Sequence, residues 1–285
     1  MGHDTGVPRH GQGHGALIGE SLPIRAIRGV VKRAASVRAP VLIIGQEGVG
    51  KESVARSIHQ SSDRCDEPFV VVDVATVAPE LTMCDLSGRE GVESTGSAQG
   101  LERCFAQADR GVIFLDNIEK MPMHLEAVLR RVLLEAAIRP LGSGKEVAID
   151  VRVISAAQID PAQLAREDRF RRRLYFWLSA VRIDVPPLRS RPEDIEPLVR
   201  HFFDALSSGK SLDSDALRAL KGYRWPGNVR ELRKVVEALS SAVQGDLIRL
   251  ADLPEPIASA TDSSPRPSPG DHTDGEGRDE APRYR

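Results

Sequence analysis

The sequence predicts an α/β fold in which a parallel five-stranded sheet is covered by helices and followed by a small all-helical domain. The first observation is an alternation of short apolar runs with helical patterns. These runs are 41–44 (VLII), 69–74 (FVVVDV), 112–115 (VIFL), 151–156 (VRVISA) and 181–185 (VRIDV). Strands that are apolar on both faces and separated by helices are typical of a buried parallel sheet.

The second observation is a change of pattern after Pro186 and Pro187. From there on the apolar residues recur with helical spacing, in 195–206, 216–220 and 229–243. A segment whose pattern is helical throughout predicts a separate helical domain packed on its own small core.

The domain boundaries follow from these patterns and from the composition of the flanks. We expect the α/β domain in residues 16–187 and the helical domain in residues 188–257. The flanks are rich in Gly, Pro, Ser, His and Asp and poor in large apolar residues. We therefore expect a disordered leader over 1–15 and a disordered tail over 258–285.

Composition excludes several classes of function. A net charge of -2 over 285 residues offers no excess of positive charge for nucleic acid or an anionic membrane. No apolar run is long enough to span a membrane, and the N-terminus lacks the apolar segment of a secretory signal. Cys65, Cys84 and Cys104 are scattered without metal-ligand spacing, which is typical of reduced thiols. We expect a cytoplasmic protein.

The stretch from Gly45 to Glu52 (GQEGVGKE) follows the first apolar run directly and opens a helical pattern. Such a glycine-rich turn directs backbone N–H groups and a helix N-terminus at the phosphates of a nucleotide, and Lys51 would reach the β- and γ-phosphates. The strict motif has Ser or Thr after the lysine as a ligand of Mg²⁺, and Glu52 departs from it. A chance glycine-rich turn is the alternative, but the strand–loop–helix context favours nucleotide binding.

A second feature of the same kind is the apolar run 112–115, which ends in Asp116. An acid at the end of a buried strand is how P-loop proteins hold Mg²⁺ beside the phosphates. Many buried strands end in Asp for other reasons, so the signal depends on its distance from the glycine-rich turn.

Several longer stretches identify a resemblance. They are LIGES at 17–21, GQEGVGKE, FAQADRGVIFLDNI, VRVISAAQID, FRRRLYFWL, VPPLRSRPEDI and YRWPGNVREL. In this order they resemble the central domain of bacterial enhancer-binding proteins, the AAA+ activators of sigma-54 RNA polymerase, over roughly residues 17–254. The resemblance implies an AAA+ P-loop domain with a helical lid, binding of ATP with Mg²⁺, and a ring, often hexameric, with ATP held between subunits.

The resemblance also implies roles for individual residues. Asp116 would hold Mg²⁺, and Arg171 would be the arginine finger that acts on the nucleotide of a neighbouring subunit. Arg230, near the start of a helix, would reach the γ-phosphate from the lid, and Asn228 and Glu231 have the spacing of a capping box around that start. The residues that would bind the nucleotide are Ile18, Gly19, Gly45, Gln46, Glu47, Gly48, Val49, Gly50, Lys51, Glu52 and Arg230.

The hydrolytic residues depart from the family pattern. The family has Glu as its catalytic carboxylate, and this chain has Asn117, which can orient a water but cannot accept its proton. Loss of a general base costs about 100- to 10,000-fold in rate. Trp177 stands where the family has a second arginine finger, and Ala157-Gln158 replaces its Thr-Asn sensor. Asp73 replaces the Asn that restrains the catalytic carboxylate.

The parts that engage the transcription machinery also differ. The family loop GAFTGA corresponds to residues 92–97, where Thr95 and Gly96 remain and Ser94 replaces the Phe that presses on sigma-54. After Pro254 the chain has a polar tail where the family has a helix-turn-helix, so we expect no DNA-binding domain. Contact with sigma-54 polymerase is therefore doubtful.

Three hypotheses follow. In the first, the chain binds ATP, hydrolyses it weakly or not at all, and regulates transcription through nucleotide-dependent assembly. In the second, it is an active ATPase that remodels sigma-54 RNA polymerase from solution. In the third, it is an interaction scaffold without nucleotide, against which Gly45, Gly50 and Lys51 argue.

Overall fold

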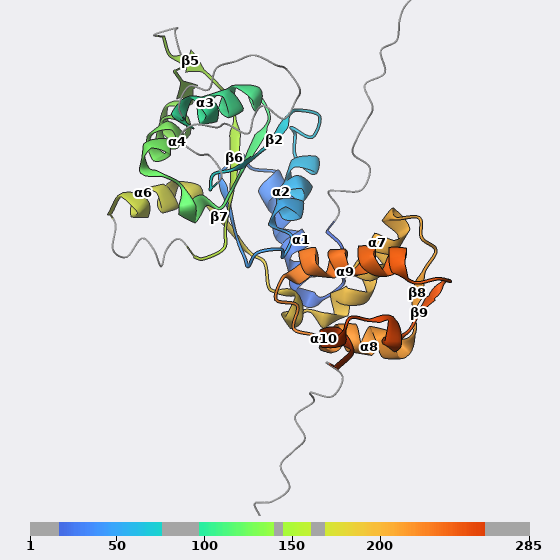
Figure 1. Cartoon of the computed structure of the whole chain (residues 1–285). Helices are drawn as coiled ribbons and strands as arrows, with labels where there is room; N and C mark the ends of the chain where they lie inside the picture. The colour runs from blue at the N-terminus through green and yellow to red at the C-terminus, as the bar shows by residue number, and fades with distance from the viewer. Residues whose placement is uncertain (1–16, 76–96, 140–144, 161–168, 260–285) are drawn as a thin grey trace, which may run out of the picture.

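The computed structural model describes residues 17–75, 97–139, 145–160 and 169–259 (Figure 1). The leader over 1–15, the loop residues 92–96 and nearly all of the tail lie outside these ranges. Among the described residues, no helix is long and apolar enough to cross a membrane.

A parallel five-stranded sheet forms the centre of the first domain, as the sequence predicted. The spatial order is β2 (Phe69–Asp73), β3 (Val112–Asp116), β6 (Arg152–Ala157), β1 (Val41–Ile44) and β7 (Val181–Asp184), and all neighbours are parallel. Every residue of β1 and β6 is buried, which is why β1 is an unbroken apolar run and β6 is apolar except for Arg152 and Ser155. Because the strands are parallel, the C-terminal ends of β2, β3, β6 and β1 lie on the same edge of the sheet. The loop after β1 starts at this edge.

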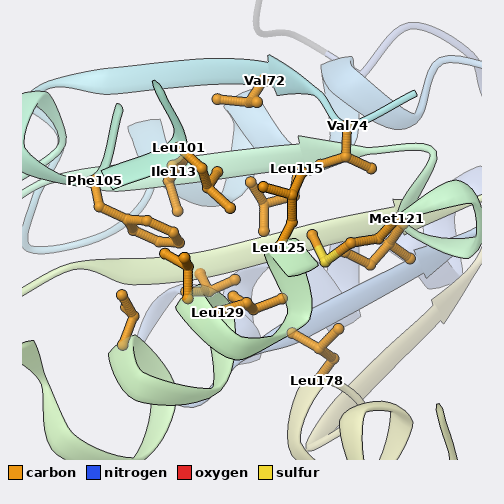
Figure 2. Close-up of a cluster of buried hydrophobic side chains, with 14 of the residues drawn as sticks. Val72, Val74, Leu101, Phe105, Ile113, Leu115, Met121, Leu125, Leu129 and Leu178 are labelled. Atoms are coloured by element: carbon orange, nitrogen blue, oxygen red, sulfur yellow. The ribbon is translucent and has the colours of Figure 1, made fainter. Parts of the chain in front are cut away.

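Helices cover both faces of this sheet (Figure 1). On one face lie α1 (Leu22–Ala35) and α2 (Lys51–Gln60), and on the other lie α3 (Ser97–Gln107), α4 (Met123–Glu135) and α6 (Arg169–Leu178). The side chains of β3 alternate between the two: Val112 and Phe114 pack toward α1 and α2, whereas Ile113 and Leu115 pack toward α3 and α4. Figure 2 shows the second of these cores, with Phe105 of α3 and Leu125 and Leu129 of α4 against β3.

The second domain is mainly helical. It contains α7 (Ile195–Ala205), α8 (Ser214–Gly222), α9 (Asn228–Ala242), the short α10 (Glu255–Ala258) and the 3-10 turns 188–190, 192–194 and 250–252. These elements pack around Trp225, which is fully buried and donates from Nε1 to Leu220 O at 2.8 Å. The helical domain is confirmed, and it also contains one short pair of parallel strands that was not predicted, β8 (Ser211–Leu212) with β9 (Leu247–Ile248). Two-residue strands give no periodic signal in a sequence.

Two further features differ from the sequence expectations. A short antiparallel hairpin, β4 (Ala137–Ile138) with β5 (Val147–Ala148), stands apart from the main sheet. Cys65 is an exposed free thiol, but the buried Cys104 is disulfide-bonded, so the expectation of reduced thiols is wrong for Cys104. Spacing along the sequence does not report the Cα separation that decides whether a disulfide can form.

Candidate nucleotide-binding site

The glycine-rich loop connects β1 to α2 and has the backbone of a phosphate cradle. Gly48 and Gly50 have φ of 73° and 102°, in the left-handed region that other residues avoid. A side chain at Gly48 would also lie 2.3 Å from the carbonyl oxygen of Gly227 in the lid. Because α2 begins at Lys51, its first N–H groups are free to meet an anion in front of the loop.

The lid holds this loop through three successive carbonyl groups. The Glu47 carbonyl accepts from Asn228 Nδ2 at 2.9 Å, the Gly48 carbonyl from the backbone N–H of Arg230 at 3.2 Å, and the Val49 carbonyl from a guanidinium nitrogen of Arg191 at 2.9 Å. In a trans peptide the next N–H points opposite to the carbonyl. The lid contacts therefore turn the N–H groups of Gly48 and Gly50 away from the lid and into the cradle.

Buried polar side chains tie the segment before α1 to the same region. Asp194 is fully buried and accepts from the N–H groups of Glu20 and Ser21, at 2.7 and 2.8 Å, and from Ser21 Oγ at 2.7 Å. A side chain at Gly19 would lie 2.5 Å from the Asp194 carboxylate, and Gly19 has φ of 128°. This close packing explains why a glycine occupies position 19. The same contacts hold the neighbouring Ile18 against the core of the lid.

A cavity of about 560 Å³ lies between the loop, Ile18 and the lid. One wall is apolar and is formed by Ile18, Val49, Leu198, Phe202 and Val229. His201, Arg233 and Glu237 supply polar groups on the lid side. An apolar slot with a few polar groups, next to a phosphate cradle, fits a nucleotide base and its ribose.

Lys51 and Asp116 face each other at the end of the sheet. Lys51 is 7% exposed, and its Nζ donates to the carbonyls of Gly45 and Gln46, at 3.1 and 3.3 Å. Burial lowers the pKa of Lys51, and the charges of Asp116 and then Glu119 oppose that shift. Burial raises the pKa of Asp116, opposed by Lys51. A buried ammonium group and a half-buried carboxylate at the mouth of the cradle are suited to bind a phosphate and its cation.

The residues present fit Mg²⁺ through Asp116. Its Oδ1 accepts from the N–H of Asn117 at 2.9 Å, and a carboxylate oxygen is the kind of ligand that Mg²⁺ takes. The described residues contain no cluster of three or more acidic, His or Cys side chains that would cage a metal by themselves. Mg²⁺ characteristically uses one or two carboxylates together with phosphate oxygens and water.

Asn117 lies at the centre of a chain of side-chain hydrogen bonds across three strand ends. Its Nδ2 donates to Asp73 Oδ1 at 2.8 Å, and its Oδ1 accepts from Gln158 Nε2 at 2.9 Å. Asn117 has φ of 56°, a conformation that Asn tolerates better than most residues. Asp73, Asn117 and Gln158, for which the sequence resemblance predicts departures from the family pattern, therefore form one connected network.

The comparisons with known proteins bear on this geometry. The family model of the sigma-54 interaction domain matches residues 17–184, and that of the AAA+ ATPase lid domain matches residues 189–269. The chain belongs to the sigma-54 interaction domain family. It is 38% identical over 248 residues to the response regulator protein PilR of Pseudomonas aeruginosa, covering 84% of this chain and 56% of that protein.

Two other relatives extend the comparison. The DNA-binding transcriptional regulator NtrC of Azospirillum brasilense is 38% identical over 265 residues, covering 92% of this chain and 54% of NtrC. The crystal structure of NtrX from Brucella abortus in complex with ATP aligns with a TM-score of 0.73 at 34% identity, covering 90% of this chain and 58% of NtrX. The sigma-54 interaction domain described here thus spans a little over half the length of each of these three relatives.

Not all residues expected at the site of this sigma-54 interaction domain are engaged there. Arg230 pairs with Glu47 at 2.5 Å, with both side chains largely exposed. Glu52 pairs with Arg56 at 2.7 Å along α2, and Gln46 Oε1 accepts from Arg189 at 2.9 Å. In these three contacts Glu47, Glu52 and Gln46 bind other side chains of the same chain.

Arg171 and Trp177, the positions expected for the two arginine fingers, both lie in α6. The side chain of Arg171 lies outside the described part of the chain. Trp177 is partly buried and packs against the core shared by α3 and α4. Its neighbour Phe176 is 76% exposed.

The structure identifies site residues that sequence reasoning missed. Asn228 is not a helix cap as expected, because Gly227 precedes α9 and the fully buried Asn228 side chain bridges Leu188 N and Glu47 O. Only the reach of Glu231 Oε2 back to Gly227 N, at 2.7 Å, matches the expected capping box. Glu119 was also missed, and the only signal for it was a carboxylate two residues beyond Asn117.

Proposed function

We propose that this chain is a cytoplasmic ATP-binding AAA+ domain of the sigma-54 activator type, that it regulates transcription through nucleotide-dependent assembly, and that it hydrolyses ATP slowly. The observation that carries the proposal is the contrast between a complete cradle and an altered hydrolytic edge. Three loop carbonyls are held by the lid, whereas Asn117 occupies the position of the family carboxylate.

ATP binding is supported by the loop, the cavity and the charges together. Lys51 would exchange its contacts with the carbonyls of Gly45 and Gln46 for phosphate oxygens, and Arg230 would approach them from the lid. Ile18 and Val49 would flank the base in the 560 Å³ cavity. Asp116 would hold Mg²⁺, which when bound neutralises phosphate charge. The NtrX structure in complex with ATP supports this assignment by analogy.

Assembly is supported by an exposed apolar residue beside the finger position. Phe176 is 76% exposed on α6, the helix that contains Arg171 and Trp177. A large exposed aromatic side chain is of the kind that protein interfaces bury. We propose that a neighbouring subunit covers this helix, in a homo- or hetero-oligomeric ring.

The test of ATP binding is the shift in melting temperature with ATP and Mg²⁺. Ligand at about 100 times its dissociation constant should stabilise the protein by roughly 2.7 kcal/mol. We expect Lys51→Ala to abolish the shift and Lys32→Ala, on the exposed face of α1, to keep it. The proposal fails when the unmodified chain shows no shift or when Lys51→Ala leaves the shift intact. Particle mass, measured in the same samples with and without ATP, tests assembly.

The second candidate, remodelling of sigma-54 polymerase from solution, makes a different prediction. Burying a Phe side chain contributes about 1.5 to 3 kcal/mol, and Ser94 offers almost none of that apolar area. We expect no open promoter complexes from purified sigma-54 polymerase with this chain and excess ATP. Open complexes formed by the unmodified chain would favour the second candidate. Opening only by the double variant Ser94→Phe with Asn117→Glu would support the loop and site assignments.

A further inference from the structure

A carboxylate beside the cradle has a buried oxygen with no partner. Glu119 lies in the 3-10 turn Ile118–Lys120, which follows β3 and Asn117 directly. Its Oε1 accepts from the backbone N–H of Gln158 at 3.3 Å. Its Oε2 is buried and has no hydrogen-bond partner among the described residues. A buried acceptor that is left unsatisfied costs about 1 to 3 kcal/mol, and more when charged, so this position favours a ligand that can donate a hydrogen bond.

The position of Glu119 relates it to the phosphates. Among the charges that act on the Lys51 ammonium, Glu119 is the second acidic group after Asp116. Lys51 is also the group that would reach the β- and γ-phosphates. Gln158 connects Glu119 with Asn117. Its backbone N–H donates to the Glu119 carboxylate, and its side-chain Nε2 donates to Asn117 Oδ1.

The other acidic side chains that act on Lys51 or on Asp116 are occupied differently. Asp73 Oδ1 accepts from Ala75 N and from Asn117 Nδ2, at 3.0 and 2.8 Å. Asp116 faces Lys51 and is the residue assigned to the cation. Glu52 pairs with Arg56. Of these carboxylates, Glu119 is the one with a buried and unpartnered oxygen.

We infer that Glu119, three residues beyond Asp116, binds the attacking water through Oε2 and accepts its proton during ATP hydrolysis. The inference rests on the ATP binding proposed above. In this step the water oxygen forms a bond to the γ-phosphorus while the bond from that phosphorus to the bridging oxygen breaks. The electron pair of the broken bond stays with the bridging oxygen, which leaves as part of ADP. Glu119 takes the proton from the water and returns it to the released phosphate. Asn117 orients the water, with its own amide held between Asp73 and Gln158.

The experiment compares steady-state turnover with ATP affinity in the full chain. Glu119→Gln keeps the shape and the Oε1 acceptor for Gln158 but cannot take a proton. We expect turnover to fall by about 100-fold or more, with the dissociation constant for ATP changed by less than about threefold. The matched control is Lys120→Gln, an exposed neighbour on the same turn, which should leave both quantities unchanged.

A second background separates a catalytic role from a structural one. Asn117→Glu supplies a new carboxylate, so adding Glu119→Gln to that variant should cost less than about threefold in turnover. A residue that only supports the fold would cost the same factor in both backgrounds, and that result would overturn the inference. Binding of ATP without turnover above the Lys51→Ala level, or turnover indifferent to Glu119→Gln, would also overturn it. Absence of ATP binding would overturn the proposed function and the inference together.

Discussion

The two sides of the candidate nucleotide site differ in how they are built. On the binding side, the loop from Gly45 to Lys51 is fixed by backbone conformation and by buried lid side chains such as Asn228 and Arg191. On the hydrolytic side, the contacts are between side chains at three strand ends, centred on Asn117. A cradle made of backbone depends on the fold itself, whereas a side-chain network can change residue by residue while the sheet stays intact. Under the proposed function, this difference in construction would let a chain keep its nucleotide site while its hydrolytic residues change.

The largest effect that would sharpen this comparison is on turnover. Asn117→Glu places a carboxylate where the family has one, and we expect steady-state ATP hydrolysis to rise by at least about tenfold. This is less than the about 100- to 10,000-fold that general-base catalysis contributes in full, because Glu119 already accepts a proton in the unmodified chain. Affinity for ATP should change little, since the cradle is untouched. Phosphate release at saturating ATP is the measurement. Fast turnover in the unmodified chain that Asn117→Glu leaves unchanged would contradict the division into an intact and an altered side.

Trp177→Arg should raise turnover only in combination with Asn117→Glu, because transition-state groups that act together are not additive. The structure adds a cost to this variant. Trp177 packs against the core shared by α3 and α4, and a charged guanidinium would lose that apolar burial. Unfolding of the single variant must therefore be measured beside its turnover.

The next effect concerns the binding side and is measured as stability. The fully buried Asn228 side chain accepts from Leu188 N and donates to Glu47 O. Asn228→Ala therefore leaves a donor and an acceptor without these partners. We expect a loss of about 2 to 5 kcal/mol in the free energy of unfolding, measured by urea titration, together with weaker ATP binding. Ser240→Ala on the same helix is the control and should change stability by less than about 0.5 kcal/mol. Equal losses of stability in the two variants would show that the contact between the lid and the glycine-rich loop does not depend on Asn228.

The fold could be predicted from the sequence, but the site only in part. Five apolar runs and a glycine-rich turn are local patterns, and they led to the correct sheet and to the cradle around Lys51. Asn228 carried a local capping pattern that the structure overrides, because its partners come from residues 40 and 181 positions away along the chain. Glu119 could not be recognised, since the burial of one oxygen depends on packing between separate strands. Sequence patterns report neighbours along the chain, and these residues act through neighbours in space.

The smallest effect would test whether the ion pair across the loop restrains the lid arginine. Glu47 and Arg230 are paired at 2.5 Å with side chains 65% and 60% exposed, so solvent and salt screen the pair strongly. Exposed ion pairs typically contribute about 0 to 1 kcal/mol, and Glu47→Gln should therefore change the stability of the ligand-free protein by less than that. Its effect on ATP should have the opposite sign, because Arg230 would no longer leave a carboxylate in order to reach a phosphate. We expect ATP to bind up to about fivefold more tightly, the factor that corresponds to 1 kcal/mol, with the gain shrinking at high salt. Titrations at two salt concentrations, with Arg230→Ala as the reference that should weaken binding, make the measurement. Weaker ATP binding in Glu47→Gln would mean that Glu47 supports the loop instead of competing for Arg230.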